Sequence, residues 1–203
     1  MPTFFTETEA WPVPLDPPRK MWTRSECSAL EATHVLDGQH LELIEGELIN
    51  KMGKNWPHVS AVTLLKAWLV SVFGVPFVVQ EAPIDVSPED NPTNEPEPDV
   101  IVLTGEVTSF APSGQPRPDD IRLVVEVADT TLHFDLTVKA SLYARAGIME
   151  YWVLDVTGRR LIVHREPQKG VYSSVLAFNE QEEIAPLAAP QAKLRFTDMF
   201  PRG

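Results

Sequence analysis

The pattern of apolar residues predicts one long helix over residues 57–74. Its apolar positions recur every three or four residues, as on one face of a helix. They are Val62, Leu65, Leu69 and Val72. Pro57 suits the first helical turn and Gly74 is typical of a helix end, so both boundaries are marked.

Shorter apolar and β-branched runs predict strands in the rest of the chain. The predicted strands are residues 41–44, 47–49, 100–103, 121–128, 151–155, 160–165 and 171–178. Glu45-Gly46 separates the first two and indicates a hairpin turn. Further β-branched runs occupy residues 75–80 and 82–86, and Tyr151 and Trp152 are expected in the core.

Two further helices are predicted. Thr23 and Glu26 have the spacing of a capping box, which predicts a short helix ending near Thr33. Another helix is expected over residues 135–146, with Gly147 as its stop. Residues 87–98 and 105–120 are rich in proline, glycine and polar residues and indicate surface loops.

These elements predict one α/β (α+β) domain with a central mixed sheet flanked by helices and an N-terminal hairpin. The domain is expected to span residues 21–203, after a proline-rich extended arm over residues 1–20. A chain of 203 residues is long enough for one good hydrophobic core.

Composition indicates a soluble protein without a membrane span. Cys27 is the only cysteine, which excludes an internal disulfide and fits a reducing, cytoplasmic compartment. The N-terminus lacks the pattern of a signal peptide. The longest apolar stretch, residues 67–79, is short and is broken by Ser71, Gly74 and Pro76, so it is not expected to span a bilayer.

The net charge of −12 argues against nonspecific coating of nucleic acid, because phosphates and acidic side chains repel each other. Residues 1–120 contain 7 Lys/Arg against 19 Asp/Glu, and residues 121–203 contain 10 of each. The excess therefore lies in the first part of the chain, and a bound divalent cation would offset it only locally.

Two carboxylates stand where strands are expected, and this pattern indicates chemistry. Asp99 opens one apolar run and Glu126 lies inside another. Burying such charges is costly unless they are paired or bind a metal. If the two strands are neighbours, Asp99 and Glu126 can bind one hard cation, with the carbonyl of Val127 as a third oxygen ligand.

Lys139 follows on the predicted helix, four residues after Asp135, so these two side chains can pair along one face. There Lys139 could position or deprotonate a metal-bound water and offset charge on a phosphate, with Asp135 orienting it. A purely structural interpretation also stands: Asp99 caps a strand, Glu126 pairs with an arginine and Lys139 is solvated. It fits Glu126 least well, because valines surround that position.

These residues resemble a restriction-endonuclease family that is widespread in cyanobacteria, within the PD-(D/E)XK nuclease superfamily. Pro98-Asp99 matches the PD element and Glu126 the second acid. The usual lysine position holds Ala128, and Lys139 stands where this family commonly carries its lysine, on the following helix. Residues 41–48 (LELIEGEL), the segment around His58 and residues 135–155 also look like the family. The resemblance covers about residues 22–200.

The resemblance implies a restriction-endonuclease-like fold and a Mg²⁺-dependent endonuclease that hydrolyses DNA, with Mn²⁺ as a possible substitute. It also implies a homo-oligomer, with a dimer favoured. It adds Glu47 as a further acid and His58 as a residue near the site, while Asp129 and His133 are candidates for substrate contact. The family usually has a Ser-Pro-Ser-type turn after its acid. This chain reads Ala128-Asp129 there, which places another acid near the site.

Two other functions stay open. A nuclease fold that binds or assembles without cutting would fit the acidic composition and Asp129. A glycosidase-like pair, Asp99 and Glu126, would need neither Lys139 nor a metal. The sequence contains no CxxC, HExxH, GxSxG or P-loop pattern, so zinc, serine-hydrolase and nucleotide-triphosphate chemistry lack their residues.

Overall fold

A computed structural model describes residues 19–51, 55–86, 90–110 and 114–200, which are called the described residues below. Its centre is a six-stranded sheet in the order β3-β4-β5-β6-β7-β8. The strands are β3 (Val78–Gln80), β4 (Val100–Leu103), β5 (Ile121–Ala128), β6 (Glu150–Asp155), β7 (Arg160–Gln168) and β8 (Val171–Asn179). Only β5 and β6 pair in parallel. The predicted mixed sheet is confirmed.

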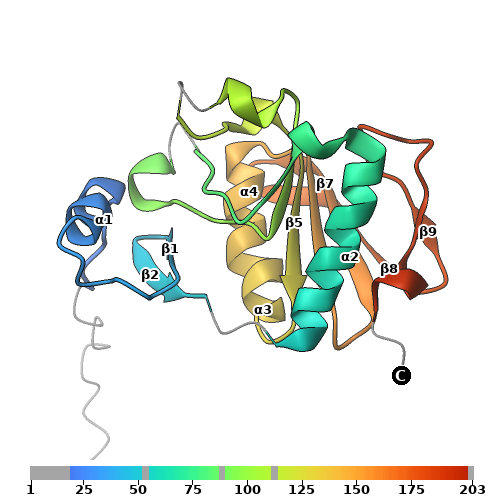
Figure 1. The fold of residues 1–203 in the computed structure, drawn as a ribbon, viewed down its shortest axis with the longest axis horizontal. Helices are drawn as coiled ribbons and strands as arrows, with labels where there is room; N and C mark the ends of the chain where they lie inside the picture. The colour runs from blue at the N-terminus through green and yellow to red at the C-terminus, as the bar shows by residue number, and fades with distance from the viewer. Residues whose placement is uncertain (1–18, 52–54, 87–89, 111–113, 201–203) are drawn as a thin grey trace, which may run out of the picture.

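Helices cover both faces of this sheet (Figure 1). Helix α2 (Trp56–Phe73) packs on one face. The other face carries a continuous helical segment of three parts: α3 (Leu132–Phe134), a π-helical turn η5 (Asp135–Lys139) and α4 (Ala140–Ala146). This arrangement gives two apolar cores, one on each side of the sheet.

Helix α2 confirms the strongest sequence pattern. The side chain of Asn55 accepts a hydrogen bond from the His58 N–H as its N-cap, and the helix ends at Gly74, whose φ is +92°. Its buried residues are Ala61, Val62, Leu65 and Leu69. By length and composition α2 could also cross a membrane, a test that core helices pass as well, and these four residues pack into the core beside the sheet.

A hairpin stands outside the main sheet, formed by β1 (Leu41–Ile44) and β2 (Glu47–Asn50). Both turn residues have positive φ, 50° for Glu45 and 74° for Gly46, as a tight two-residue hairpin turn requires. Beside it lies α1 (Arg24–Glu31), which begins with the predicted capping box of Thr23 and Glu26. A bridge between Leu43 and Glu95 joins the hairpin to the loop before β4.

Some local structure differs from the prediction. In the run 75–80, Val75–Phe77 forms a 3₁₀ turn, because Pro76 favours a turn, and only three residues enter β3. Residues 82–86 form no strand, although Ile84 and Val86 are buried. The predicted helix 135–146 starts earlier, at Leu132, and contains the π turn.

The remaining elements are short. They are the strands β9 (Glu183–Ile184) and β10 (Leu194–Arg195) and the 3₁₀ turns η2 (Asn91–Thr93), η3 (Val107–Ser109), η4 (Pro118–Asp120) and η6 (Phe196–Met199). Strands of two residues carry too little periodicity to predict. The proline-rich arm predicted for residues 1–20 lies almost wholly outside the described residues.

Candidate active site

Strand alternation directs the two predicted acids to the same face of the sheet. On β5, Val124 and Ala128 pack toward α4, and Glu126 shares their parity. On β4, Ile101 packs toward the same side, and Asp99 shares its parity. Val100 pairs with Val125, so Asp99 and Glu126 stand opposite each other one step beyond that pair. Both are buried.

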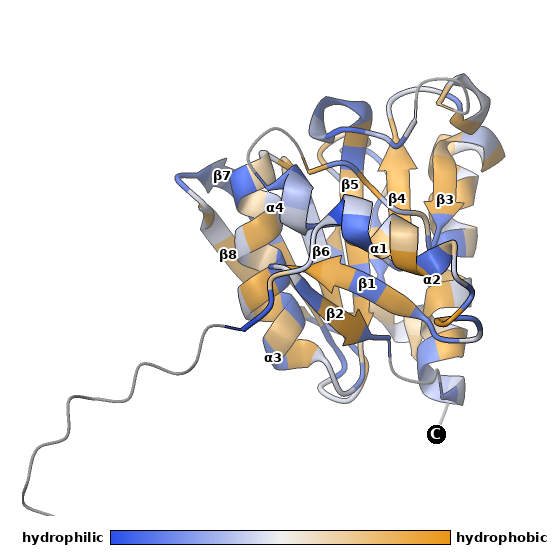
Figure 2. Cartoon of the chain, turned by 90° about the vertical axis from the view of Figure 1, so that its left-hand side faces the viewer, coloured by the Kyte–Doolittle hydropathy of each residue, from blue (hydrophilic) through white to orange (hydrophobic). Residues whose placement is uncertain are grey.

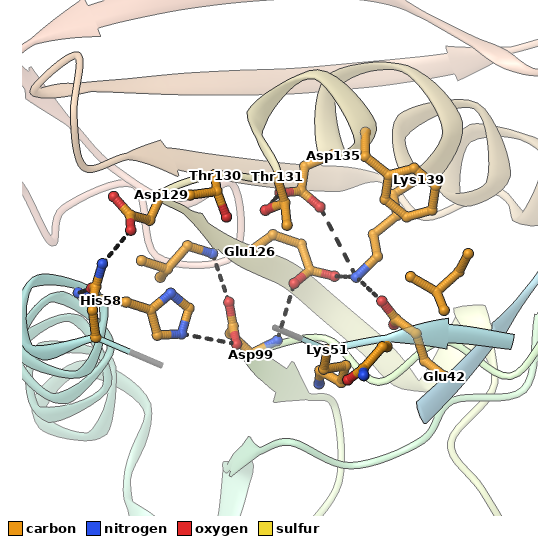
Figure 3. A pocket seen from close by; sticks show the side chains of 15 residues that line it. Glu42, Lys51, His58, Asp99, Glu126, Asp129, Thr130, Thr131, Asp135 and Lys139 are labelled. Atoms are coloured by element: carbon orange, nitrogen blue, oxygen red, sulfur yellow. Dashed lines mark hydrogen bonds and ion pairs between the residues drawn. The ribbon is translucent and has the colours of Figure 1, made fainter. Parts of the chain in front are cut away.

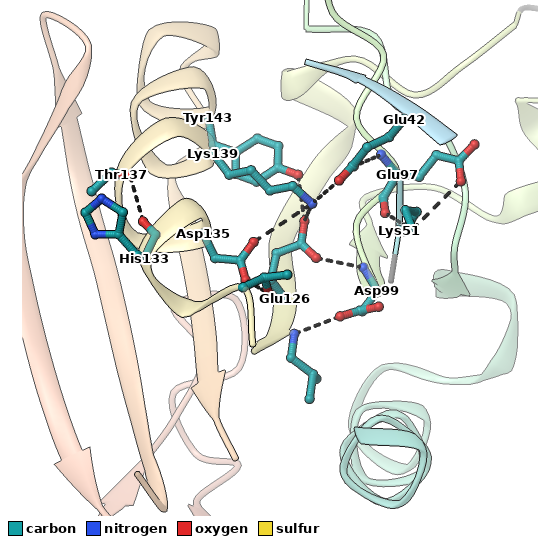
Figure 4. A network of polar contacts seen from close by, with 12 residues as sticks. Glu42, Lys51, Glu97, Asp99, Glu126, His133, Asp135, Thr137, Lys139 and Tyr143 are labelled. Carbon is teal, nitrogen blue, oxygen red and sulfur yellow. Dashed lines mark hydrogen bonds and ion pairs between the residues drawn. The ribbon is translucent and has the colours of Figure 1, made fainter. Parts of the chain in front are cut away.

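The ammonium group of Lys139 lies between carboxylates from two different parts of the fold (Figure 4). Its Nζ is 2.8 Å from Glu126 Oε1 on the central sheet and 2.9 Å from Glu42 Oε1 on the hairpin. Asp135 Oδ1 is 4.0 Å away, four residues earlier on the same helical segment. Lys139 therefore links the hairpin, the sheet and the helix in one buried ion cluster.

Tyr143 completes one face of this helical segment with Asp135 and Lys139, at steps of four residues. Its hydroxyl donates to Glu126 Oε1 at 3.0 Å, so this oxygen has two donors. The other oxygen, Oε2, accepts only a long 3.4 Å bond from the Asp99 N–H. The π turn that carries Asp135 and Lys139 is of a kind often found at functional sites.

Asp99 is held from two sides (Figure 3). The backbone N–H of Val127 donates to its Oδ2 at 2.8 Å. His58 Nε2 lies 3.5 Å from its Oδ1, an ion-pair distance rather than a close hydrogen bond, and this buried nitrogen has no hydrogen-bond partner among the described residues. Burial pushes the pKa of Asp99 upward, but His58 and the Val127 N–H outweigh it and hold the pKa below its usual value.

The cluster contains more negative than positive groups, and burial together with this imbalance shifts the pKa values of its members. Burial is the largest effect on Glu126 and raises its pKa to about 8, against the lowering by Lys139. Burial likewise raises the pKa of Asp135 to about 6. Burial alone would lower the pKa of Lys139, but Glu126 and Glu42 outweigh it and raise the pKa above its ordinary value.

The free oxygens of this cluster match the ligands of a hard divalent cation. Asp99 Oδ1, Glu126 Oε2 and Asp135 Oδ1 have no partner closer than 3.4 Å among the described residues, and such cations prefer carboxylate oxygen. No three His, Cys, Asp or Glu side chains stand together at metal-binding spacing among the described residues. A third protein ligand would therefore come from the backbone. The Val127 carbonyl is suitably placed, because the N–H of the same residue already faces Asp99.

A cavity of about 90 Å³ opens beside these groups. Its polar rim includes Lys51, Asn55 and Asp129 (Figure 3). Asn55 donates to the Asp129 carboxylate, and Lys51 Nζ donates to the Glu97 carbonyl at 2.6 Å. Asp129 thus brings a further negative charge to the entrance, as the sequence predicted.

The fold brings together Asp99, Glu126, Lys139, Asp135, His58 and Val127 from the predicted set. It does not bring Glu47 to them. Glu47 lies on the same face of the hairpin as Glu42. It pairs with Ile44, which is two positions nearer the turn than Glu42, so the two glutamates are about 7 Å apart along the strand direction. It is 48% exposed and contacts Arg19. His133 is also exposed and does not line the cavity.

Sequence reasoning missed Glu42, Tyr143 and Lys51. Glu42 carried a usable signal, because it interrupts the apolar run of a predicted strand, as Glu126 does. Tyr143 lies at helical spacing from Leu136 and Ala140, and such an apolar pattern does not reveal that its hydroxyl meets a carboxylate. Lys51 had no pattern of its own.

The mixed sheet, with Glu126 on β5, Asp99 directly before β4 and Lys139 on the following helical segment, has the arrangement expected from the resemblance to restriction-endonuclease-like proteins. The chain belongs to the Uma2 family, described as "Putative restriction endonuclease", which matches residues 26–197. The resemblance first seen in the PD element, Glu126 and Lys139 is therefore confirmed at the level of the family.

A solved structure supports the same fold. It is described as a putative nuclease belonging to DUF820 from Anabaena variabilis ATCC 29413. The two chains superpose with a TM-score of 0.59 at 17% sequence identity, over 80% of this chain and 90% of that chain. At this identity the likeness concerns the fold alone. Comparison with curated proteins gives no match.

Proposed function

We propose that this protein is a divalent-metal-dependent endonuclease that hydrolyses phosphodiester bonds in DNA, with Mg²⁺ as its ion and Mn²⁺ as a substitute. One observation carries the proposal: Asp99, Glu126 and Lys139 converge in one buried cavity from separate elements. Membership of a restriction-endonuclease family supports the same reaction class. DNA as the substrate follows from that family and not from the site itself.

The proposal assigns the metal to Asp99, Glu126 and the Val127 carbonyl. A divalent cation held there would lower the pKa of a bound water and polarise a phosphoryl oxygen. Glu126 would act as a ligand in its ionised form. Because its pKa is raised to about 8, cation binding would release a proton in neutral solution.

The other residues would hold the groups that react. Lys139 stays protonated and can orient the attacking water or balance negative charge on the phosphate. Glu42 and Asp135 position its ammonium group, and Tyr143 fixes the Glu126 carboxylate. His58 lies beside Asp99 at the cavity wall and can orient that carboxylate.

Cleavage of plasmid DNA with Mg²⁺ or Mn²⁺ tests this proposal. We expect wild-type protein to cut and to stop in EDTA, and we expect Glu126→Ala and Lys139→Ala to lose at least about a hundredfold in rate, as for removal of groups that stabilise a transition state. Equal residual cleavage by the wild type and both variants would reject the assigned site. Cleavage of a glycoside that persists in EDTA would favour the glycosidase-like pair instead.

Glu42 and Glu47 provide a matched pair of variants, because both are hairpin glutamates on the same face. Glu42→Gln is expected to lower the cleavage rate about tenfold or more, since Lys139 loses one of its positioning carboxylates. Glu47→Gln should leave the rate unchanged, since Glu47 is exposed and pairs only with Arg19 among the described residues. The reverse result would show that Glu47, and not Glu42, is the hairpin acid that contributes to the site.

The alternative of a nuclease fold that only binds or assembles is favoured by the excess of acid around the cavity, including Asp129 at its rim. It predicts a stable protein that takes up no divalent cation. Calorimetric titration with Mg²⁺ and Mn²⁺ separates the two functions. Heat of cation binding supports the endonuclease, and a folded protein that gives no such heat supports the fold that only binds or assembles.

A further inference from the structure

Strand β8 forms one margin of the main sheet, opposite to β3 (Figure 2). It pairs with β7 between Val171 and Asn179, apart from Ser173. Among the described residues, no strand pairs with its outer side, and no hydrogen bond from another element reaches the backbone of residues 171–178. Its outer row of N–H and C=O groups is therefore open.

The composition of β8 is unusual for such an edge. The strand reads VYSSVLAFN, without a charged residue or proline. Its exposed apolar residues are Val171, Val175 and Leu176, at 62%, 51% and 55%. Natural proteins usually protect an edge strand with charges, prolines, bulges or short length, because an unprotected edge pairs with another chain.

The opposite edge of the same sheet provides the contrast. Strand β3 has only three residues, and its last residue, Gln80, accepts a hydrogen bond from Lys66 at 3.1 Å. A strand of three residues beside a lysine has few backbone groups with which a strand of another chain could pair. Of the two edges of the main sheet, only β8 combines length, exposed backbone and apolar side chains.

We propose that β8 pairs in antiparallel fashion with β8 of a second copy, so that the two six-stranded sheets join across a two-fold axis. The chain carries a net charge of −12, so contacts between acidic surfaces of two copies would repel, whereas β8 adds no charge. Lys169 precedes the strand and Glu180 follows it. Antiparallel pairing brings the basic end of each copy near the acidic end of the other.

This interface is independent of the proposed nuclease function. The acids lie on or beside β4 and β5, and β6 and β7 separate them from β8. Strands are spaced about 4.8 Å apart, so β5 lies roughly 14 Å from the paired edge. Both cavities therefore stay accessible in the dimer.

The test is the mass of the full chain in solution, measured by light scattering after gel filtration. One chain has a mass of 22.7 kDa, and we expect the wild type at twice this value. The double variant Val175→Lys with Leu176→Lys should fall to the single-chain mass, because both positions lie at the centre of β8 and the four lysines of a pair would gather near the two-fold axis and repel one another. A wild type that is monomeric at all concentrations overturns the proposal.

A control and a second measurement separate β8 pairing from other dimers. The double variant Val35→Lys with Val75→Lys changes two apolar residues that are exposed elsewhere, at 64% and 72%, and should remain dimeric. In the wild type, hydrogen exchange should show protection of alternate β8 amides that is lost in the monomeric variant. Circular dichroism confirms that each variant is folded. A folded β8 variant that stays dimeric, or unprotected β8 amides in the dimer, refutes the interface.

Discussion

Two of the buried charge clusters among the described residues, one around Glu150 and one around Lys139, are built in opposite ways. Glu150 on β6 accepts from Arg165 Nε at 2.8 Å, from Trp152 Nε1 at 3.0 Å and, at its other oxygen, from the Leu187 N–H at 2.7 Å. One carboxylate thus meets one guanidinium, and both oxygens have close donors.

The site cluster is not balanced in this way. Its carboxylates Glu42, Glu126 and Asp135 share one buried cation, Lys139, and the buried Asp99 beside them faces His58. Glu126 Oε2 has only a long contact, and the pKa values of Glu126 and Asp135 are raised. A balanced pair serves the fold, whereas an excess of buried acid opposes stability and is typical of a functional site.

The largest expected effect concerns the balanced pair. Arg165→Met leaves Glu150 buried without its cation and should lower the free energy of unfolding by about 3–5 kcal/mol. Arg145→Met is the control, since Arg145 pairs with Glu45 and Asp90 near the surface and should cost at most about 1 kcal/mol. Urea denaturation of both variants measures the difference. Equal costs would show that Glu150 and Arg165 are not a structural pair.

The site cluster should instead make stability depend on pH. Burial raises the folded-state pKa of Asp135 to about 6 and of Glu126 to about 8, above the values in the unfolded chain. The folded state therefore holds protons that the unfolded state has released, and stability falls by several kcal/mol as pH rises from about 4 to 8.

Denaturation at several pH values checks this direction, with and without Mg²⁺. If Mg²⁺ binds these carboxylates as proposed, it replaces the protons, and Mg²⁺ should stabilise the protein more at pH 8 than at pH 6. A stability that rises through this range in the absence of metal would contradict the raised pKa values.

The smallest expected effect has the opposite sign to that of Arg165→Met. Asp135→Asn removes one excess carboxylate, keeps an oxygen that can accept from Thr131, and should stabilise the metal-free protein by about 1 kcal/mol at pH 7. It should also flatten the pH dependence below about pH 6. Thermal unfolding at pH 5 and pH 7 measures both effects, and destabilisation at both values would place Asp135 among the structural charges.

The fold could largely be predicted from local patterns. The capping box at Thr23, the turn at Glu45-Gly46 and the helix that ends at Gly74 depend on residues close in sequence, and all three are present. The run 82–86 failed, because apolar residues can be buried in a loop as well as in a strand. The π turn at Asp135–Lys139 has no pattern that separates it from an ordinary helix.

Part of the site was also accessible from the sequence. Asp99 opens an apolar run, Glu126 lies inside another, and Lys139 follows Asp135 at helical spacing, so these charges could be selected as candidates from the sequence. Glu47 was chosen from resemblance, and Glu42 proved to be the hairpin acid that meets Lys139. Both glutamates lie on the same face of the hairpin, Glu42 on β1 and Glu47 on β2. Only the position of the hairpin against the helix decides which of them reaches Lys139.

The sequence by itself marked Asp99 and Glu126 as charges at expected strands and placed Lys139 on a helix four residues after Asp135, because strand runs and helical spacing are local properties. Only the tertiary structure decided which charges meet. The contact of Glu42 with Lys139, the approach of His58 to Asp99 and the hydroxyl of Tyr143 on Glu126 join elements distant in the chain. The acids of the cavity come from different elements, so their excess over basic groups arises only when folding brings these elements together.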